Sequence, residues 1–291
     1  MPNIQNTLKL DALTKHDWQF NLPNKNLPNN KHFIVIGNPI SHSKSPEIQQ
    51  KFAKKTGLTI DYRRQFCPDN WESFLAVVAA FFHGGGCGAN VTIPFKVMAF
   101  ELCQHVGILS DFAKAAGAVN TLAIKEGKLF GDNTDGQGLV ADLMLQGIDL
   151  TNKNILIIGA GGATRGVILP LLNANIGKLH IANRTSAKAH NLAKLFNNPK
   201  ISVLNLTDIS GHFDVIINAT SAGLNGETLS FDNDVSADFV YDMMYGKPSA
   251  FLQFFNQKNV AVSDGFGMLI HQGALAFEIW TQQKVDLAKL T

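Results

Sequence analysis

The chain has 291 residues, with 25 Lys and Arg against 23 Asp and Glu and a formal net charge of +2. Hydrophobic residues make up 45% and charged residues 16%, which excludes a largely disordered chain, and the length favours two lobes. A balanced chain without a basic block gives no electrostatic basis for binding nucleic acid. No apolar run approaches the roughly 18–20 residues that a membrane-spanning helix needs, so we expect no membrane association.

The cysteines indicate a reducing compartment. Cys67, Cys87 and Cys103 are odd in number and none has CxxC spacing, so we expect neither a disulfide framework nor a metal site. The first residues lack the charged and apolar regions of a secretory signal, and the first 31 contain acids but no Arg, unlike a transit peptide. We therefore expect a cytoplasmic protein.

Residues 1–31 are rich in asparagine and have no sustained apolar period. We expect them to form an N-terminal extension that is flexible and lies outside the fold or drapes over it.

The folded part begins with a short apolar run, and helical and strand patterns then alternate. The first half predicts a strand at 32–37, a helix at 45–56, a strand at 62–67, a helix at 69–83, a strand at 89–93 and a helix opening at Pro94. A polar turn around Gly127 joins 120–124 to 128–130 as a hairpin. These alternating elements predict an α/β lobe.

The second half is more regular. Buried-strand patterns occur at 154–158, 178–182, 201–206, 214–217 and 239–243, several of them separated by helical patterns, and a long helical stretch starts at Met268. This succession is typical of a parallel sheet covered on both faces.

A glycine-rich turn joins the strand at 154–158 to the helix at 164–175. It consists of Gly159, Ala160, Gly161, Gly162 and Ala163. Glycines there let the backbone approach a pyrophosphate, and the helix N-terminus supplies N–H groups and a positive dipole end. Thr164 stands where the third glycine of GxGxxG is usual, but the strand before and the helix after favour a dinucleotide site over an ordinary turn.

The residues after the next strand favour NADP. An NAD enzyme usually places Asp or Glu there, to accept from the ribose 2′-hydroxyl. Here Asn183, Arg184 and Thr185 follow the strand, and Lys188 is nearby. Arg184 is one of only four arginines. It could hold a 2′-phosphate; the alternative is a basic helix start without a ligand, which the helix dipole disfavours.

Three further fragments contain residues suited to chemistry. Lys96 lies just inside a predicted helix start, where the dipole opposes a cation and favours proton exchange. Asp135 enters another helix, and Ser43 and Ser45 precede a third, where two hydroxyls suit a carboxylate or polyol. For each fragment alone, a surface lysine, an N-cap or a serine helix start is the commoner explanation.

Together, these fragments resemble the shikimate dehydrogenase family, NADP-dependent enzymes of aromatic amino-acid biosynthesis. The matching motifs occur in family order and cover residues 32–291. They lie at 37–40 with 43–46, 90–96, 117–121, 131–136, 159–163, 183–185, 218–221, 241–245 and 265–269 with Gln272. Residues 1–31 precede the point where family members usually begin, and Lys188 stands where an Arg is common, which weakens bidentate phosphate recognition.

The resemblance implies a role for each site residue. Lys96 and Asp135 form the proton-transfer pair. The residues implied around shikimate are Ser43, Ser45, Thr92, Asn120, Asp135, Tyr245 and Gln272. Those implied around NADP are Gly159, Ala160, Gly161, Gly162, Ala163, Asn183, Arg184, Thr185, Lys188, Thr220, Met243 and Gly265. No metal is implied.

It also implies the domain organisation. Residues 32–134 with 266–291 would form an α/β substrate-binding domain, to which the C-terminal helix returns, and residues 136–265 a Rossmann-type NADP-binding domain. We expect a monomer or homodimer that binds a small-molecule substrate.

The activity implied is the reversible reduction of 3-dehydroshikimate to shikimate with NADPH, on the route to chorismate and the aromatic amino acids. A quinate/shikimate dehydrogenase with broader NAD(P) use is the nearest alternative, and the missing acid after residue 182 argues against it. A catalytically silent NADP-binding module could dispense with Lys96 or Asp135, yet both are present. A methylenetetrahydrofolate dehydrogenase would not explain the paired serines.

Overall fold

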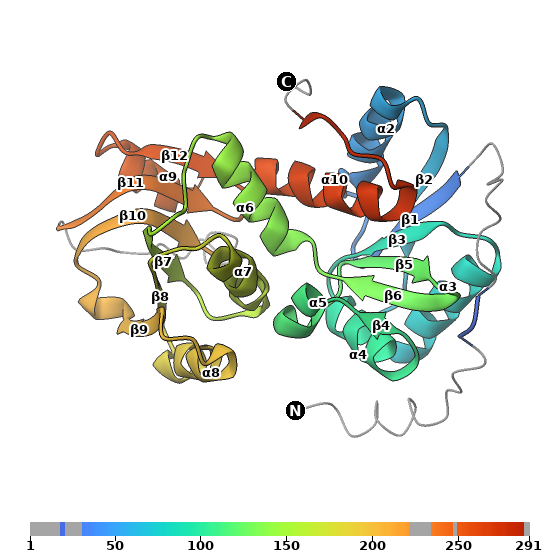
Figure 1. Cartoon of the computed structure of the whole chain (residues 1–291), viewed down its shortest axis with the longest axis horizontal. Coiled ribbons are helices and arrows are strands. Elements are labelled where there is room, and N and C mark those ends of the chain that lie inside the picture. Colours follow the sequence, from blue (N-terminus) through green and yellow to red (C-terminus); the bar gives the residue numbers. More distant parts are fainter. Residues whose placement is uncertain (1–17, 21–30, 221–233, 247–248, 288–291) are drawn as a thin grey trace. The chain divides into compact units, whose positions relative to one another are not determined.

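The structure is a computed structural model of the whole chain, and it describes residues 18–20, 31–220, 234–246 and 249–287. The chain divides into two compact units, each described separately below: unit 1 comprises residues 1–134 and 272–291, and unit 2 residues 135–271. Each contains one six-stranded sheet (Figure 1). The α/β fold expected from the sequence is thereby confirmed. Within the described ranges, no helix is long and apolar enough to span a membrane.

Unit 1 has a mixed sheet in the strand order β2-β1-β3-β5-β6-β4. Strands β1 (Lys31–Gly37), β2 (Ile60–Phe66) and β3 (Gly88–Val91) run parallel, whereas β5 (Thr121–Lys125) is antiparallel to both β3 and β6 (Lys128–Asp132). The β5–β6 connection turns at Glu126 and Gly127, both with positive φ, as a tight hairpin requires. The short β4 (Ile108–Leu109) pairs with β6.

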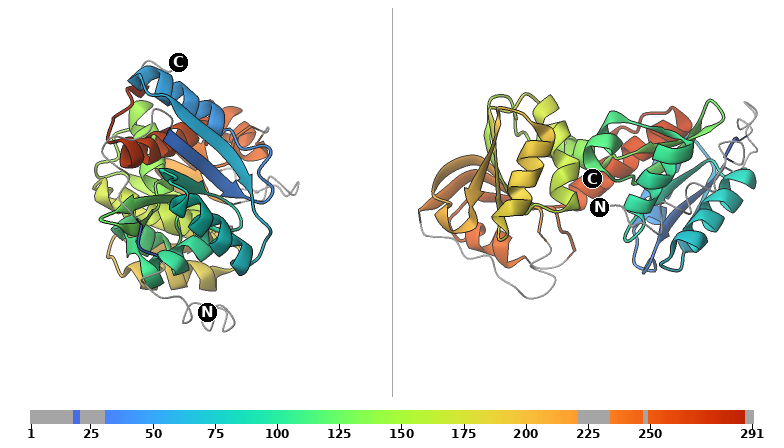
Figure 2. Two further views of the ribbon diagram at one scale, coloured as in Figure 1. Left: turned by 90° about the vertical axis from the view of Figure 1, so that its right-hand side faces the viewer. Right: turned by 90° about the horizontal axis from the view of Figure 1, so that it is seen from below.

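Helices cover both faces of this sheet because the strands alternate in the direction of their apolar side chains. Ile34 and Ile36 belong to a cluster with α3 (Trp71–His83) and α4 (Lys96–Val106). On the opposite face, Phe33 packs on Trp280 of α10 (Phe266–Thr281), with ring centroids 5.0 Å apart. Figure 2 shows α2 (Ser45–Thr56) and α10 beside β1 and β2. The short α5 (Asp111–Ala116) precedes β5.

Residues 18–20 are packed against unit 1. Trp18 and Phe20 are buried, and Gln19 forms an isolated antiparallel bridge with Lys128. These three residues therefore lie on the fold. The other residues of the segment 1–30 lie outside the described ranges.

Unit 2 has an all-parallel sheet in the order β12-β11-β10-β7-β8-β9. Its strands are β7 (Asn154–Ile158), β8 (Lys178–Asn183), β9 (Ile201–Asn205), β10 (Gly211–Asn218), β11 (Val235–Asp242) and β12 (Ala261–Asp264). Helices α6 (Asp135–Leu145), α7 (Gly162–Asn173) and α8 (Ser186–Phe196) contribute to a cluster on one face, and α9 (Ala250–Asn256) to a cluster on the other. The near-continuous apolar strands are typical of a sheet buried on both faces.

The start of α4 differs from the sequence prediction. Helix α4 begins at Lys96 with Phe95 as its N-cap, so Pro94 is not in the first helical turn. The Phe95 N–H donates to the Thr92 carbonyl in a turn, which occupies the backbone before the helix. Lys96 is nevertheless the first residue of the helix, as close to its N-terminus as predicted.

Candidate active site

Several predicted substrate residues lie at one edge of the unit 1 sheet. Strands β1 and β3 are parallel, so the loops that follow Gly37 and Val91 leave the same edge. Because β5 is antiparallel to β3, Asn120, the residue before β5, lies at that edge too, and its carbonyl accepts from Val91 N–H. A Cβ added to Gly37 would overlap the Thr92 methyl group, so this glycine permits the two loops to approach closely.

Asn120 is the centre of a buried hydrogen-bond group. Its Oδ1 accepts from Thr134 N–H at 3.0 Å and from Thr121 Oγ1 at 2.9 Å, and its Nδ2 donates to Thr134 Oγ1 at 3.1 Å and to Gln272 Oε1 at 3.4 Å. Asn120 and Gln272, predicted from different motifs, are thus brought together. Thr134 immediately precedes Asp135, so the group fixes the backbone that enters α6.

The two predicted serines lie at the start of α2. Ser43 Oγ and Ser45 Oγ are 3.2 Å apart, and both residues are partly buried. Arg64 of β2 donates from Nε to the Ser43 carbonyl at 2.9 Å and pairs with Glu47 of α2 at 2.5 Å. The Arg64 hydrogen bond lowers the pKa of Glu47. These contacts fix the backbone of the segment that contains Ser43 and Ser45, and the two hydroxyl groups lie next to each other.

Other polar residues of unit 1 were missed by the sequence analysis. The Tyr62 hydroxyl donates to Asn90 Oδ1 at 2.7 Å, and Asn90 Nδ2 donates to the Asn120 carbonyl at 3.2 Å. Gln49 of α2 is almost fully buried and donates to the Gly273 carbonyl, next to Gln272, at 3.0 Å. A tyrosine in a strand and a glutamine in a helix give no local signal; only these long-range contacts connect them with the predicted site.

The predicted cofactor residues of unit 2 follow the carboxyl ends of parallel strands. Gly159, Asn183, Thr220, Met243 and Gly265 stand at or just after the ends of β7, β8, β10, β11 and β12 respectively. All five strands point the same way, so these residues lie along one edge of the sheet. In open parallel sheets that edge is where ligands bind.

Close backbone contacts hold this edge together. Gly159 has a φ of +116°, and a Cβ there would lie 3.2 Å from Thr220 Cγ2 and from the Ala219 carbonyl group. Thr220 Oγ1 in turn donates to Asn218 Oδ1 at 2.8 Å. A Cβ on Gly265 would overlap the Met243 carbonyl. The predicted cofactor residues therefore form two close pairs, Gly159 with Thr220 and Met243 with Gly265.

The glycine loop fits a dinucleotide phosphate. A Cβ on Gly161 or Gly162 would meet nothing within 4 Å, so the space beside the loop is open. Gly161 is the N-cap of α7 and provides no side-chain cap, which leaves the first N–H groups of α7 to bind an anion. Thr164, at the position of the usual third glycine, is fully buried.

The residues predicted to hold the 2′-phosphate lie at the start of α8. Arg184, Thr185 and Lys188 are exposed, and Asn183 Nδ2 donates to the Thr185 carbonyl at 2.9 Å, which shapes the turn. Thr185 is the N-cap of α8 and makes no side-chain cap hydrogen bond. The residues present fit NADP: basic side chains stand where an acid would oppose a phosphate.

Two further predicted residues, Asp135 and Tyr245, belong to unit 2. Asp135 is the first residue of α6 and is partly buried. Tyr245 follows β11, and its ring centroid is 6.2 Å from that of Phe266 at the start of α10. Tyr245 is 37% exposed, and the partial burial of its side chain raises the pKa of its hydroxyl.

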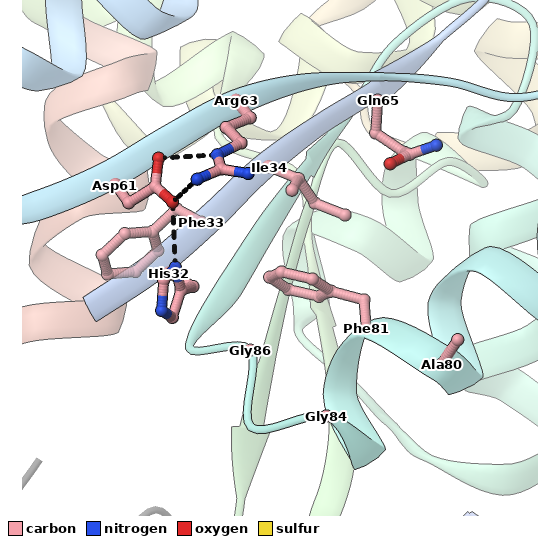
Figure 3. Close-up of a pocket in the computed structure, with 10 residues that line it drawn as sticks. All are labelled: His32, Phe33, Ile34, Asp61, Arg63, Gln65, Ala80, Phe81, Gly84 and Gly86. Atoms are coloured by element: carbon pink, nitrogen blue, oxygen red, sulfur yellow. Dashed lines mark hydrogen bonds and ion pairs between the residues drawn. The ribbon is translucent and has the colours of Figure 1, made fainter. Parts of the chain in front are cut away.

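A pocket on unit 1 lies apart from these residues. It has a volume of about 310 Å³ and is formed by β1, β2 and the C-terminal end of α3 (Figure 3). Its polar wall is already paired internally, since Asp61 Oδ2 lies 2.7 Å from Arg63 Nη2 and 3.0 Å from His32 Nδ1. None of the predicted site residues lines it.

The fold and these residues define a two-unit α/β oxidoreductase that uses a dinucleotide cofactor. The family models that match the chain describe the shikimate dehydrogenase substrate-binding domain (residues 35–122), shikimate/quinate 5-dehydrogenase (140–226) and the shikimate 5′-dehydrogenase C-terminal domain (265–290). The chain belongs to the shikimate dehydrogenase family, which confirms the resemblance found in the sequence.

Individual relatives agree with this assignment. A shikimate dehydrogenase (NADP(+)) of Psychrobacter cryohalolentis is 52% identical over 90% of this chain and 96% of its own. Among solved structures, an Ael1 enzyme from Pseudomonas putida is 34% identical, covers 89% of this chain and 96% of its own, and has a TM-score of 0.82. The Thermus thermophilus shikimate 5-dehydrogenase, in complex with NADP(H) and shikimate, is 31% identical, with the same coverage and a TM-score of 0.78.

Proposed function

We propose that the protein reduces 3-dehydroshikimate to shikimate with NADPH, reversibly, on the route to chorismate and the aromatic amino acids. The observation that carries this proposal is the arrangement of Gly159, Asn183, Thr220, Met243 and Gly265 along the carboxyl edge of one parallel sheet. The relatives named above as NADP(+)-dependent shikimate dehydrogenases support the choice of substrate and cofactor.

The glycine loop and the start of α8 would hold the cofactor. The N–H groups of Gly161, Gly162 and Ala163 would bind the pyrophosphate at the α7 N-terminus. Arg184, Thr185 and Lys188 would bind the 2′-phosphate, and Thr220, Met243 and Gly265 would line the nicotinamide side. When bound, NADPH supplies the hydride that the carbonyl carbon of the substrate accepts.

Lys96 and Asp135 would carry the proton. Lys96 Nζ donates its proton to the carbonyl oxygen as that oxygen gains charge, and Asp135 orients and balances the lysine. Lys96 is the first residue of α4, and Asp135 is the first residue of α6.

The substrate would be held through its carboxylate and ring hydroxyls. Ser43, Ser45 and the protonated Tyr245 hydroxyl would donate to the carboxylate. Thr92, Asn120 and Gln272 would face the ring hydroxyls. The hydrogen bond from Asn120 to Gln272 orders these amides in advance, which lowers the entropic cost of binding.

The reaction is tested by identifying its product. Purified protein incubated with 3-dehydroshikimate and NADPH should consume both and yield shikimate, detected by NMR. Consumption of NADPH without shikimate formation, or no consumption at all, would overturn the proposal. We expect this activity in the cytoplasm, in a monomer or homodimer, which cell fractionation and sedimentation velocity would test.

A further inference from the structure

Two helices contain the points at which the chain passes from one unit to the other. Unit 2 begins with Asp135, the first residue of α6, and it ends at His271 inside α10. Both helices also carry a residue of the proposed site, Asp135 in α6 and Gln272 in α10. Contacts that fix the rotation of these helices therefore bear directly on the proposed reaction.

Within unit 2, a buried polar cluster joins α6 to the start of α10. Asp142 of α6 is 4% exposed and Tyr241 of β11 is fully buried. The Tyr241 hydroxyl donates to Asp142 Oδ2 at 2.6 Å and accepts from the Met268 N–H of α10 at 3.2 Å. Met268 lies in the first turn of α10, where an N–H has no partner within its own helix. Tyr241 thus supplies that partner and binds both helices.

Two more contacts restrict the Asp142 carboxylate. Gln146 Nε2 donates to Asp142 Oδ2 at 3.1 Å and to Ser263 Oγ of β12 at 3.1 Å. A Cβ added to Gly267 would overlap the Asp142 carboxylate, so α6 and α10 approach closely only because residue 267 is glycine. The carboxylate is held on one side by two donors and on the other by the backbone of α10.

Helical spacing connects this cluster with the site residues. Asp142 follows Asp135 by seven residues, about two turns, so both lie on the same face of α6. Gln272 follows Met268 by four residues, about one turn, on the same face of α10. In unit 1, Gln272 Oε1 accepts from Thr134 Oγ1 at 3.5 Å, next to Asp135 in the sequence.

We propose that Asp142 and Tyr241 are positioning residues that set the rotation and register of α6 and α10, and thereby present Asp135 and Gln272 to the substrate. The inference rests on the proposed function. A buried carboxylate is costly compared with an apolar side chain of similar size, so filling the core does not explain Asp142. Its hydrogen bonds to Tyr241 and Gln146, together with the lack of space for a Cβ at Gly267, specify one arrangement of the two helices.

Two conservative variants test the cluster from opposite sides. Tyr241→Phe removes only the hydroxyl, and Gly267→Ala displaces the carboxylate while it improves helix propensity. For both, we expect kcat/KM for shikimate to fall about 3- to 30-fold. The Kd for NADPH, measured by fluorescence titration, should stay within about twofold of wild type because neither residue belongs to the proposed cofactor site.

A double variant and a packing control separate a positioning role from a loss of stability. In an Asp142→Ala background the carboxylate is absent, so adding Gly267→Ala should lower kcat/KM by less than about twofold further. Phe255→Leu, in the other core of unit 2, should lower the thermal midpoint without changing kcat or KM. If Asp142→Ala does not fold, Tyr241→Phe and Gly267→Ala decide the outcome.

The inference is overturned if Tyr241→Phe and Gly267→Ala keep wild-type kcat/KM for shikimate, or if they weaken NADPH binding as much as they lower kcat/KM. The inference is also overturned if Gly267→Ala lowers kcat/KM by the same factor in the Asp142→Ala background as in the wild-type protein. If the wild-type protein oxidises shikimate and both variants have the same kcat/KM, the proposed function stays intact and only the positioning role is refuted.

Discussion

Phe20 and Phe82 form an edge-on ring pair with centroids 5.8 Å apart, although Phe20 belongs to the asparagine-rich segment that precedes β1. The ring centroids of Phe20 and His83 are 4.7 Å apart, and the backbone N–H of Phe20 donates to the Gly127 carbonyl at 2.8 Å. Trp18 is buried beside it, with ring centroids 6.1 Å apart. Residues 18–20 therefore attach the N-terminal segment to α3 and to the β5–β6 hairpin.

This attachment predicts that Phe20→Ala destabilises the protein. Removing a buried aromatic ring should lower the free energy of unfolding by about 3–5 kcal/mol, measured by urea denaturation. Gln19→Ala is the matched control, since Gln19 is exposed between the two buried rings and should change stability by less than about 0.5 kcal/mol. Equal stability of the two variants would show that the attachment contributes nothing.

Lys96→Ala should lower turnover about 10²–10⁴-fold, because it removes the proposed proton donor. The Kd for NADPH should stay near that of wild type, since the proposed cofactor residues all lie in unit 2. Lys51→Ala, an exposed lysine of α2, is the control for loss of charge. Turnover above a third of the wild-type value would contradict the role of Lys96.

Arg184→Ala should raise KM for NADP far more than KM for NAD. A charge-assisted hydrogen bond to a 2′-phosphate is worth about 1.5–3 kcal/mol, which corresponds to roughly 10- to 150-fold in KM for NADP. NAD lacks this phosphate and should be affected little. The exposed Lys178→Ala variant controls for general electrostatic attraction. Equal changes for both cofactors would refute the assignment.

Asp214 should make unit 2 sensitive to acid. Burial favours the protonated form, but the Lys153 ammonium at 2.8 Å and the Asn154 N–H at 2.6 Å outweigh it and hold the pKa of Asp214 below its usual range. Because the folded-state pKa is depressed, this stabilisation is fully present above the unfolded-state pKa of about 3.9 and is lost as the pH falls through the folded-state value.

The Asp214→Asn variant should therefore be less stable than wild type at pH 6, and the difference should shrink below about pH 4. Urea midpoints across this pH range give the comparison, with the exposed Asp234→Asn as control. A difference that stays constant between pH 6 and pH 3 would show that ionisation of Asp214 does not contribute.

Local sequence patterns were sufficient to predict secondary structure where strands and helices alternate regularly. Apolar strand runs and the glycine turn at 159–163 predicted the parallel sheet of unit 2, because a doubly covered sheet requires such runs. Pro94 was placed wrongly, since the turn from Thr92 to Phe95 uses a hydrogen bond that no local preference reveals. The sequence left open whether the N-terminal extension lies on the fold or outside it, because two isolated aromatic rings, Trp18 and Phe20, set no period.

The contacts that order the candidate site are mostly long-range. Asn120 and Gln272 are 152 positions apart, and Asp142 and Tyr241 are 99 apart. Composition and spacing cannot pair such residues. The roles of Lys96 and Asp135 follow from the family resemblance, and that of Arg184 was also inferred from the missing acid after the strand. All three stay predictions until variants of these residues are measured.

The central claim is tested most directly by initial rates of dinucleotide reduction, with shikimate or quinate crossed against NADP or NAD. The account predicts turnover with shikimate and NADP, and little with quinate. It predicts little turnover with NAD because Arg184 and not an acid follows β8. Comparable rates with quinate or NAD would contradict it in favour of a broader dehydrogenase. NADP binding without turnover of any pair would contradict enzymatic function itself.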